Sequence, residues 1–293
     1  EIGGSYRLPD VMECSGAKLR EVGTTNKTHL FDYQRAINEE TGALLKVHPS
    51  NFEVVGFTKT VSTKGMVALA SEHDLSVIDD VGSGALIDFS EFGLMDEPVV
   101  SQSIKDGADV VLFSGDKLIG GPQCGIIIGK RKYIDTILSN PLMRAMRVDK
   151  MTLAALSATL LIYRDENRAR TEIPILRMLS MPKENLKLRA EKIVAQLSHL
   201  GELEICEAVE ADSMLGGGSL PTQKLSTWCV ALTPKTQSVD RLAAGLRNGE
   251  PSVIGRVQKE RFFLDMRTVQ PSQDSGLVES IEAYCDESNS EAE

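Results

Sequence analysis

Residues 110–122 have the sequence VVLFSGDKLIGGP, the most informative stretch of the chain for its architecture. An apolar run is followed at once by a polar Ser-Gly-Asp-Lys turn, and a Gly-Gly-Pro turn comes soon after. A short apolar run bounded by turn residues is typical of a strand buried on both faces. The stretch therefore predicts a strand at 110–113 that delivers Lys117 to the end of a sheet.

The rest of the first half repeats this alternation of short apolar runs with segments of helical spacing. Strands are predicted at 18–22, 43–48, 75–79, 110–113 and 125–129, and helices at 31–40, 64–73 and 101–107. Strands that alternate with helices imply βαβ units and a parallel sheet. The sequence therefore predicts an α/β fold: a mainly parallel sheet with helices on both faces, in a large domain over residues 1–150.

The pattern changes after residue 150. Residues 151–165 have strong helical spacing and open a predicted bridging helix segment at 151–175. A smaller C-terminal α/β domain is predicted over 176–283, with helices at 183–200 and 239–246 and strands at 226–232 and 261–266. Residues 284–293 are polar and acidic, so we expect a disordered tail there.

Composition excludes several classes of protein. The formal net charge is −10, whereas proteins that hold nucleic acid by releasing counterions are usually basic, so the chain is not a generic polyanion binder. No apolar run reaches the roughly 20 residues that span a bilayer and the start has no signal-peptide pattern, so we expect a cytoplasmic protein. Five dispersed cysteines argue against a disulfide framework and a zinc site. The chain opens on Glu1 in what reads as mid-domain sequence, so we expect it to be N-terminally incomplete.

Polar residues follow three of the predicted strands: Pro49 to Asn51, Asp80 to Gly84, and Ser114 to Lys117. In open α/β sheets, ligands bind beyond the carboxyl ends of the strands. An amine held against apolar walls stays neutral and nucleophilic, as imine formation requires. A carboxylate on a neighbouring strand suits a pyridinium nitrogen, and small residues let backbone N–H groups approach a phosphate. Each feature alone also fits a solvated loop, a turn or a helix cap.

Four segments, 20–29, 80–84, 113–123 and 144–153, closely resemble the bacterial selenocysteine synthases, the L-seryl-tRNA(Sec) selenium transferases. These enzymes belong to the aspartate-aminotransferase group, fold type I, of enzymes that use pyridoxal 5′-phosphate (PLP). The resemblance extends from Glu1 to about Arg267. It implies the fold type I architecture for the α/β domain predicted above.

The resemblance also implies roles for single residues around PLP. Lys117 matches the lysine that forms the Schiff base and is the implied catalytic residue. Asp80 matches the partner of the pyridinium nitrogen, Asn51 the contact to the ring O3′, and Ser114 a phosphate contact. Asp116, next to the lysine, is implied to tune its protonation.

Arg144 and Arg147 match the family's basic cluster for the phosphate-bearing selenium donor, selenophosphate. One helical turn separates them, which would place them on one face. The alternative for this pair is an ordinary solvated helix face. His48 lies at the same rim and is a candidate cofactor contact, whereas Arg256 and Arg267 stay unassigned because the carboxylate of an esterified serine is not free.

The implied reaction converts L-seryl-tRNA(Sec) to L-selenocysteinyl-tRNA(Sec) through a Schiff base, β-elimination of water to aminoacrylyl-tRNA, and addition of selenium. The resemblance further implies a homo-oligomer built from dimers, and tRNA contacts made mainly by a preceding N-terminal region. Two alternatives remain open. One is a PLP-dependent lyase acting on a small amino acid or amino sugar acid without tRNA, and the other is a truncated chain that serves only as an interface or folding unit.

Overall fold

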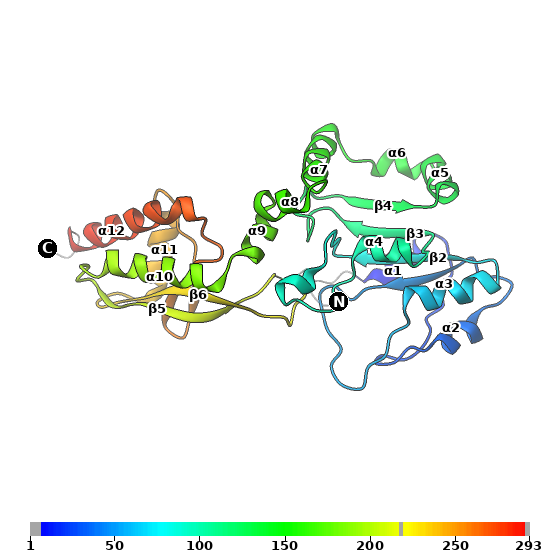
Figure 1. Ribbon diagram of the computed structural model, residues 1–293, viewed down its shortest axis with the longest axis horizontal. Coiled ribbons are helices and arrows are strands. Elements are labelled where there is room, and N and C mark those ends of the chain that lie inside the picture. The colour runs from blue at the N-terminus through cyan, green and yellow to red at the C-terminus, as the bar shows by residue number, and fades with distance from the viewer. Residues whose placement is uncertain (1–6, 217–218, 291–293) are drawn as a thin grey trace. The chain divides into compact units, whose positions relative to one another are not determined.

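The computed structural model describes residues 7–216 and 219–290. The chain divides into two compact units (Figure 1). Unit 1 comprises residues 1–175 with 215–223, and unit 2 comprises residues 176–214 with 224–293. The described ranges contain no helix that is both long and apolar enough to cross a bilayer.

Unit 1 is built on one sheet with the strand order β1-β2-β3-β4. β1 (Ala43–Val47), β2 (Ser76–Gly82) and β3 (Val110–Ser114) are parallel to one another, and β4 (Gly125–Gly129) is antiparallel to β3. Helices separate the parallel strands along the chain, but the connection from β3 to β4 has none, so the chain turns straight back. The predicted α/β fold with a mainly parallel sheet is confirmed.

Helices α3 (Thr63–Glu72) and α4 (Val100–Lys105) cover one face of this sheet. Met66 and Leu69 of α3 pack with Val77 of β2, and Val100 of α4 packs with Val81 farther along the same strand. On the opposite face, Ile78 and Asp80 are only partly buried. Successive strand residues point to opposite faces, so β2 presents an apolar row to the helices and Asp80 to the other side.

Two predictions for the N-terminal part need correction. Residues 18–22 form no strand; they are exposed or only partly buried and pair with nothing regular. The helix predicted at 31–40 is α2 (Leu30–Ala36), preceded by α1 (Leu8–Glu13). It starts where the Asp32 carboxylate accepts a hydrogen bond from the His29 backbone N–H at 2.8 Å, and it ends where Ile37 adopts an extended conformation.

The predicted bridging segment at 151–175 is not one helix. It contains α7 (Lys150–Ile162), α8 (Glu166–Glu172) and the start of α9 (Pro174–Ser180). The break between α7 and α8 has a local cause, because Asp165 caps the N-terminus of α8 as Asp149 caps that of α7. Ahead of α7 lie η1 (Phe89–Phe92), α5 (Arg131–Ser139) and α6 (Leu142–Met146).

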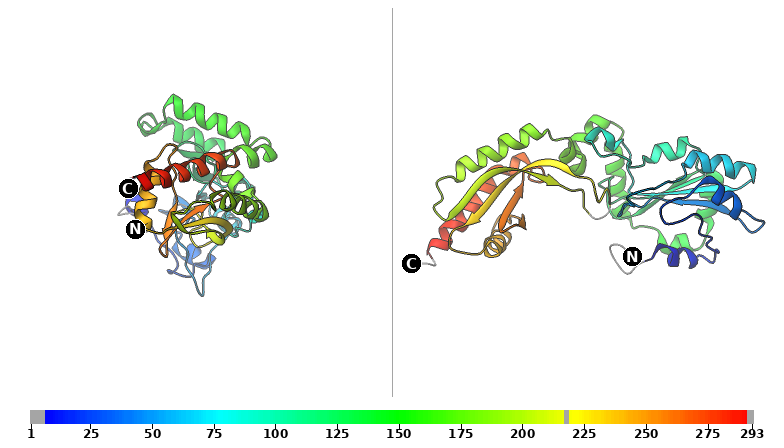
Figure 2. Two further views of the ribbon diagram at one scale, coloured as in Figure 1. Left: turned by 90° about the vertical axis from the view of Figure 1, so that its left-hand side faces the viewer. Right: turned by 90° about the horizontal axis from the view of Figure 1, so that it is seen from below.

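Unit 2 is an antiparallel sheet with the order β5-β6-β8-β7 and helices packed against it (Figure 2). The strands are β5 (Leu203–Ser213), β6 (Leu225–Pro234), β7 (Arg256–Gln258) and β8 (Arg261–Asp265), and the helical elements are α10 (Lys183–Leu197), α11 (Val239–Asn248), η2 (Pro271–Gln273) and α12 (Asp274–Ser290). Apolar residues of the three α-helices form one core with β6 and β8. Burial of this core is the main stabilising term for the unit.

Two features of unit 2 differ from the predictions. β5, the longest strand, was not predicted, although Leu203 to Ser213 alternates apolar and polar residues over much of its length. The tail predicted to be disordered from residue 284 is helical up to Ser290 in α12, whereas residues 291–293 lie outside the described part. Cys285 is buried in the core and the Tyr284 hydroxyl donates to Gln237 Oε1 at 2.7 Å, so tertiary packing extends the helix.

Gly84 offers a test of the packing at the carboxyl edge of the unit 1 sheet. Its φ is +75°, and a Cβ there would lie 2.6 Å from the backbone oxygen of Ser114. We expect Gly84→Ala to lower the free energy of unfolding by at least about 2 kcal/mol, from backbone strain and the clash together. Gly93 is the matched control, with φ +77° and nothing within 4 Å, so Gly93→Ala should cost only about 1 kcal/mol. Equal losses in urea denaturation would contradict the close approach.

Candidate active site

The carboxyl ends of β1, β2 and β3 meet at one edge of the unit 1 sheet. Val47 at the end of β1 is in register with Asp80 of β2, and Gly82 is in register with Phe113 of β3. The backbone N–H of His48 donates to the Asp80 carbonyl at 2.8 Å, which extends this pairing past β1. The predicted convergence of three polar segments is therefore present in the structure.

Lys117 lies in the turn after β3 with its side chain partly buried. Its Nζ is 3.4 Å from the Ser50 Oγ in the turn after β1. The next residue anchors the turn: Leu118 is buried, and its N–H donates to the Ser83 carbonyl at 3.0 Å. Gly120 N–H closes the turn on the Lys117 carbonyl at 3.0 Å. The backbone on the C-terminal side of Lys117 is therefore held by two main-chain hydrogen bonds.

Two consecutive aspartates in β2 have different environments because their side chains point to opposite faces. Asp79 is 2% exposed, and its Oδ2 accepts a hydrogen bond from the Thr63 hydroxyl at 2.8 Å. Lys46 Nζ donates to the same hydroxyl at 2.9 Å. Asp79 is thus engaged in structure beneath α3, which leaves Asp80 as the carboxylate on the side of Lys117.

The pKa of Asp80 is raised above its usual value, chiefly because burial disfavours the charged form. The charge of Lys117 opposes this shift, as does a hydrogen bond from the Gly82 backbone N–H. The Asp79 charge raises the pKa further, and His48 lowers it. The charge of Lys117 and the pKa of Asp80 are therefore electrostatically coupled.

Gly82 keeps the space between two of these groups open. The pairing of β2 with β3 is irregular between Asp80 and Gly82, and Gly82 has φ +71°. A Cβ at Gly82 would lie 3.6 Å from Ser50 Oγ and 3.9 Å from Asp80 Oδ1. The missing side chain therefore leaves a cradle bordered by a hydroxyl and a carboxylate.

Sequence reasoning missed one residue of this edge, Glu97. It is buried in the connection before α4, where its Oε1 accepts a short hydrogen bond from Ser83 Oγ. His48 Nε2 lies 3.8 Å from the other carboxylate oxygen. No spacing or motif in the sequence singles out Glu97, because only the fold brings it to the strand ends.

The other predicted PLP residues occupy the same edge with different exposure. Asn51 lies in the turn after β1 and Ser114 ends β3, and both are partly buried. Asp116 is exposed. Burial raises the pKa of the Cys124 thiol, and the Asp116 charge adds to that shift. The carboxylate of Asp116 therefore lies close enough to act on Cys124.

Arg144 and Arg147 lie in and just after α6, and both are exposed. The helix is shorter than their spacing suggests. Arg147 is its C-cap residue with an extended backbone, although its N–H still closes on the Met143 carbonyl at 3.1 Å. This bond keeps the three-residue spacing from Arg144 helical, so one shared helical face stays a prediction, and α6 ends at Arg147.

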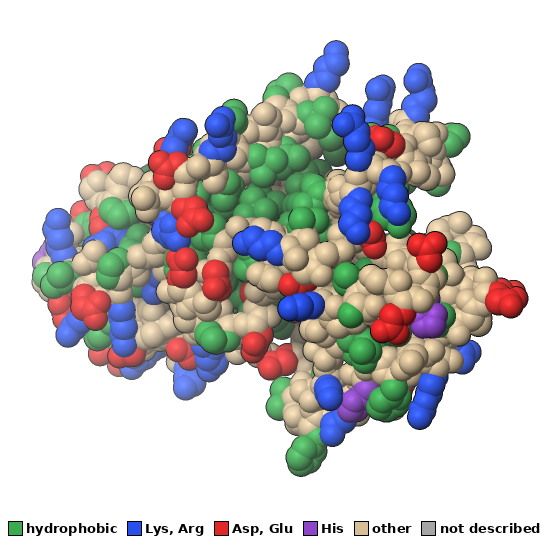
Figure 3. All heavy atoms as spheres, turned by 45° about the vertical axis from the view of Figure 1, so that its right-hand side comes forward, with side chains coloured by type: hydrophobic (Ala, Val, Ile, Leu, Met, Phe, Trp, Pro, Cys, Tyr) green, Lys and Arg blue, Asp and Glu red, His purple; other side chains and the backbone are tan. Residues whose placement is uncertain are grey.

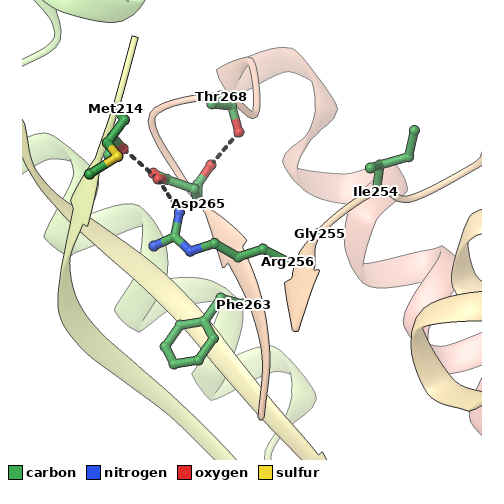
Figure 4. A pocket seen from close by; sticks show the side chains of 8 residues that line it. Met214, Ile254, Gly255, Arg256, Phe263, Asp265 and Thr268 are labelled. Atoms are coloured by element: carbon green, nitrogen blue, oxygen red, sulfur yellow. Dashed lines mark hydrogen bonds and ion pairs between the residues drawn. The ribbon is translucent and has the colours of Figure 1, made fainter. Parts of the chain in front are cut away.

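Arg256 and Arg267, which the sequence left unassigned, both belong to unit 2. Arg267 is 6% exposed, and its guanidinium donates to backbone carbonyls, including that of Met178 at 2.7 Å. Burial lowers its pKa. Arg256 lines a shallow pocket in which it points toward the Asp265 carboxylate, 3.1 Å away, near the ring of Phe263 (Figure 4). In the described structure Arg267 is thus a core residue and Arg256 half of an ion pair.

The coupling between Lys117 and Asp80 can be measured directly. We expect Lys117→Met to move the carboxyl ¹³C titration of Asp80 to higher pH, since the loss of a nearby cation raises the pKa of a carboxyl group. Lys64→Met, at an exposed lysine of α3, is the control and should leave the midpoint in place. An unchanged midpoint in Lys117→Met would separate the two groups electrostatically.

Comparison with known proteins bears on this geometry. Residues 1–270 match the family described as L-seryl-tRNA selenium transferase. The L-seryl-tRNA(Sec) selenium transferase of Maridesulfovibrio salexigens is 51% identical over 283 residues, which cover 96% of this chain and 61% of that protein. The enzyme of the same name from Clostridium perfringens is 50% identical over 269 residues, covering 92% of this chain and 58% of the relative.

The fold has a counterpart among solved structures. D-Glucosaminate-6-phosphate ammonia-lyase aligns with a TM-score of 0.57 at 21% identity, covering 95% of this chain and 67% of that one. This likeness concerns the fold alone. The chain spans about 60% of the length of the curated relatives it matches. On the sequence match over most of its length, the chain belongs to the L-seryl-tRNA selenium transferase family.

Proposed function

We propose that this chain carries the cofactor-binding part of an enzyme that converts L-seryl-tRNA(Sec) to L-selenocysteinyl-tRNA(Sec). The observation that carries the proposal is the position of Lys117, held beside Asp80 and Ser50 at the carboxyl edge of the sheet. Family membership supplies the reaction, because the relatives are named for selenium transfer to seryl-tRNA. The lyase alternative is less well supported, since the lyase shares only the fold.

The residues at this edge fit PLP. Lys117 offers an amine for the aldehyde, and Asp80 offers a partly buried carboxylate for the pyridinium nitrogen. The cradle at Gly82 leaves room beside them, and we assign Asn51 to the ring oxygen and Ser114 to the phosphate. When bound, PLP draws electrons from the α-carbon of an attached amino acid and so eases loss of its proton.

Lys117 would act twice in this reaction. As a neutral amine it is a nucleophile toward the cofactor aldehyde, and once displaced it remains beside the α-carbon as a base. The anchored turn around Leu118 keeps the amine within reach while its methylene stem moves. Asp80 would accept a hydrogen bond from the protonated ring nitrogen, which requires the carboxyl group to be ionised despite its raised pKa.

The proposed second substrate is selenophosphate. Arg144 and Arg147 are exposed cations close in sequence, and guanidinium groups bind phosphate through paired hydrogen bonds. We assign them to the phosphate of the donor. Serine would lose its α-proton and its β-hydroxide as water. Selenium would then bond to the β-carbon and the α-carbon would regain a proton, while the bond from selenium to phosphorus breaks and water takes the phosphoryl group as phosphate.

The tRNA partner and the oligomer are further parts of the proposal. The formal net charge is −10, and the face drawn in Figure 3 has apolar side chains gathered at its centre with acidic and basic side chains around them. The acidic net charge supports tRNA contacts made mainly by a region other than these 293 residues. Helices α6 and α7 expose apolar side chains: Met146 is 72% exposed and Met151 is 80% exposed. Such exposed apolar surface supports a homo-oligomer built from dimers.

Five unpaired cysteines support a cytoplasmic location.

Borohydride trapping tests the cofactor and the lysine together. After PLP is added to the chain and reduced, we expect the phosphopyridoxyl label on Lys117 by peptide mapping, because this amine is the one held at the cradle. Lys117→Ala should lose the label, and Lys105→Ala, at an exposed lysine of α4, should retain it. Label on another lysine, or none, would reject the proposed site.

The arginine assignment has a separate test with thiophosphate as the probe. A charge-assisted hydrogen bond contributes about 1.5–3 kcal/mol, so Arg144→Ala and Arg147→Ala should each weaken binding at least about tenfold in calorimetric titration. Arg131→Ala is the control, since Arg131 is exposed at the start of α5 and pairs with Asp135. Wild-type affinity in both variants, or no binding by the wild-type chain, would remove these arginines from the donor site.

A further inference from the structure

Glu97 is a carboxylate buried at the edge of the sheet that carries Lys117. Its side chain is 1% exposed. Oε1 accepts the hydrogen bond from Ser83, but Oε2 has no hydrogen-bond partner within the described structure. A buried carboxylate oxygen without a partner is costly unless a positive charge compensates for the lost hydration. His48 Nε2, 3.8 Å from Oε2, is the group placed to do so.

The position of Glu97 connects it to all three strand ends. His48 follows β1. Ser83, which is fully buried, follows β2 and donates its hydroxyl to Glu97, while its carbonyl accepts the N–H of Leu118 next to Lys117. The Glu97 carboxylate thus contacts the loops that follow β1 and β2 directly. It is connected to the loop of Lys117 through Ser83.

We propose that Glu97 is a positioning residue of the candidate active site, binding His48 as an imidazolium and so keeping a second positive charge beside Asp80. The catalytic meaning of this ion pair rests on the proposed function. The ion pair itself is a property of the protein without cofactor.

The second charge matters because Lys117 has to be neutral when it acts as a nucleophile or base. A neutral Lys117 gives Asp80 no electrostatic support. The remaining influences on the pKa of Asp80 are then burial and Asp79, which raise it, and the Gly82 N–H and His48, which lower it. With Glu97 holding the imidazolium, one nearby cation still lowers the pKa of Asp80 during the steps in which Lys117 has lost its proton.

The test follows the carboxyl ¹³C titration of Asp80 in the full chain without cofactor, with Asp80→Asn identifying the signal. We expect His48→Gln and Glu97→Gln each to move the midpoint to higher pH, and by the same amount. The double variant should move it no further, because both changes remove the same cation. Gln at position 97 keeps the shape and an oxygen for Ser83, so the change isolates the charge.

Glu91→Gln is the matched control: Glu91 lies in η1, ahead of the same connection, and pairs with Arg170 at the surface. It should leave the Asp80 midpoint unchanged. A wild-type midpoint in Glu97→Gln, or shifts that add in the double variant, would overturn the proposal. An unchanged midpoint in His48→Gln would overturn it even if Glu97→Gln failed to fold. Failure of Lys117 labelling would reject the proposed function and leave this result standing.

Discussion

Parallel pairing is the constraint on which the candidate site depends. Because β1, β2 and β3 run in the same direction, the residues that follow them emerge at one edge, whatever the length of the connections between them. Backbone hydrogen bonds continue past the strands, from His48 to Asp80 and from Leu118 to Ser83. The side chains of Ser50, Asp80 and Lys117 therefore meet on a scaffold of main-chain bonds, not on flexible loops.

The carboxylates at this edge of the sheet differ in their surroundings, and burial shifts the pKa of Asp80. Asp79 and Asp80 are adjacent in sequence, yet the pleat of β2 directs one to Thr63 beneath a helix and the other to Lys117. Dehydration raises the pKa of Asp80, and neighbouring cations hold it down. The pKa of Asp80 therefore depends on the charges of Lys117 and His48. Loss of a proton from the Lys117 amine would raise the pKa of the Asp80 carboxyl group.

The two units differ in how completely their apolar surface is buried. Unit 2 packs three helices on one face of an antiparallel sheet and closes a continuous core. In unit 1, helix α7 is apolar along most of its length, but none of its residues is buried. Apolar helices that expose such surface are typical of regions that pack against another chain or segment.

The sequence by itself determined the α/β class, most of the strands of unit 1, the lysine turn and the polar segments around it. It could do so because alternation of apolar runs with turn residues is a local signal, and the lysine loop carries a specific motif. It misplaced elements whose formation depends on partners: residues 18–22 have apolar spacing but no strand to pair with, and the end of α12 is helical because Cys285 packs in a core. Only the tertiary structure decided that Asp79 accepts a hydrogen bond from Thr63, that Lys117 lies against Ser50, and that Glu97 reaches His48. Those facts depend on contacts between residues far apart in the chain, which no local pattern encodes.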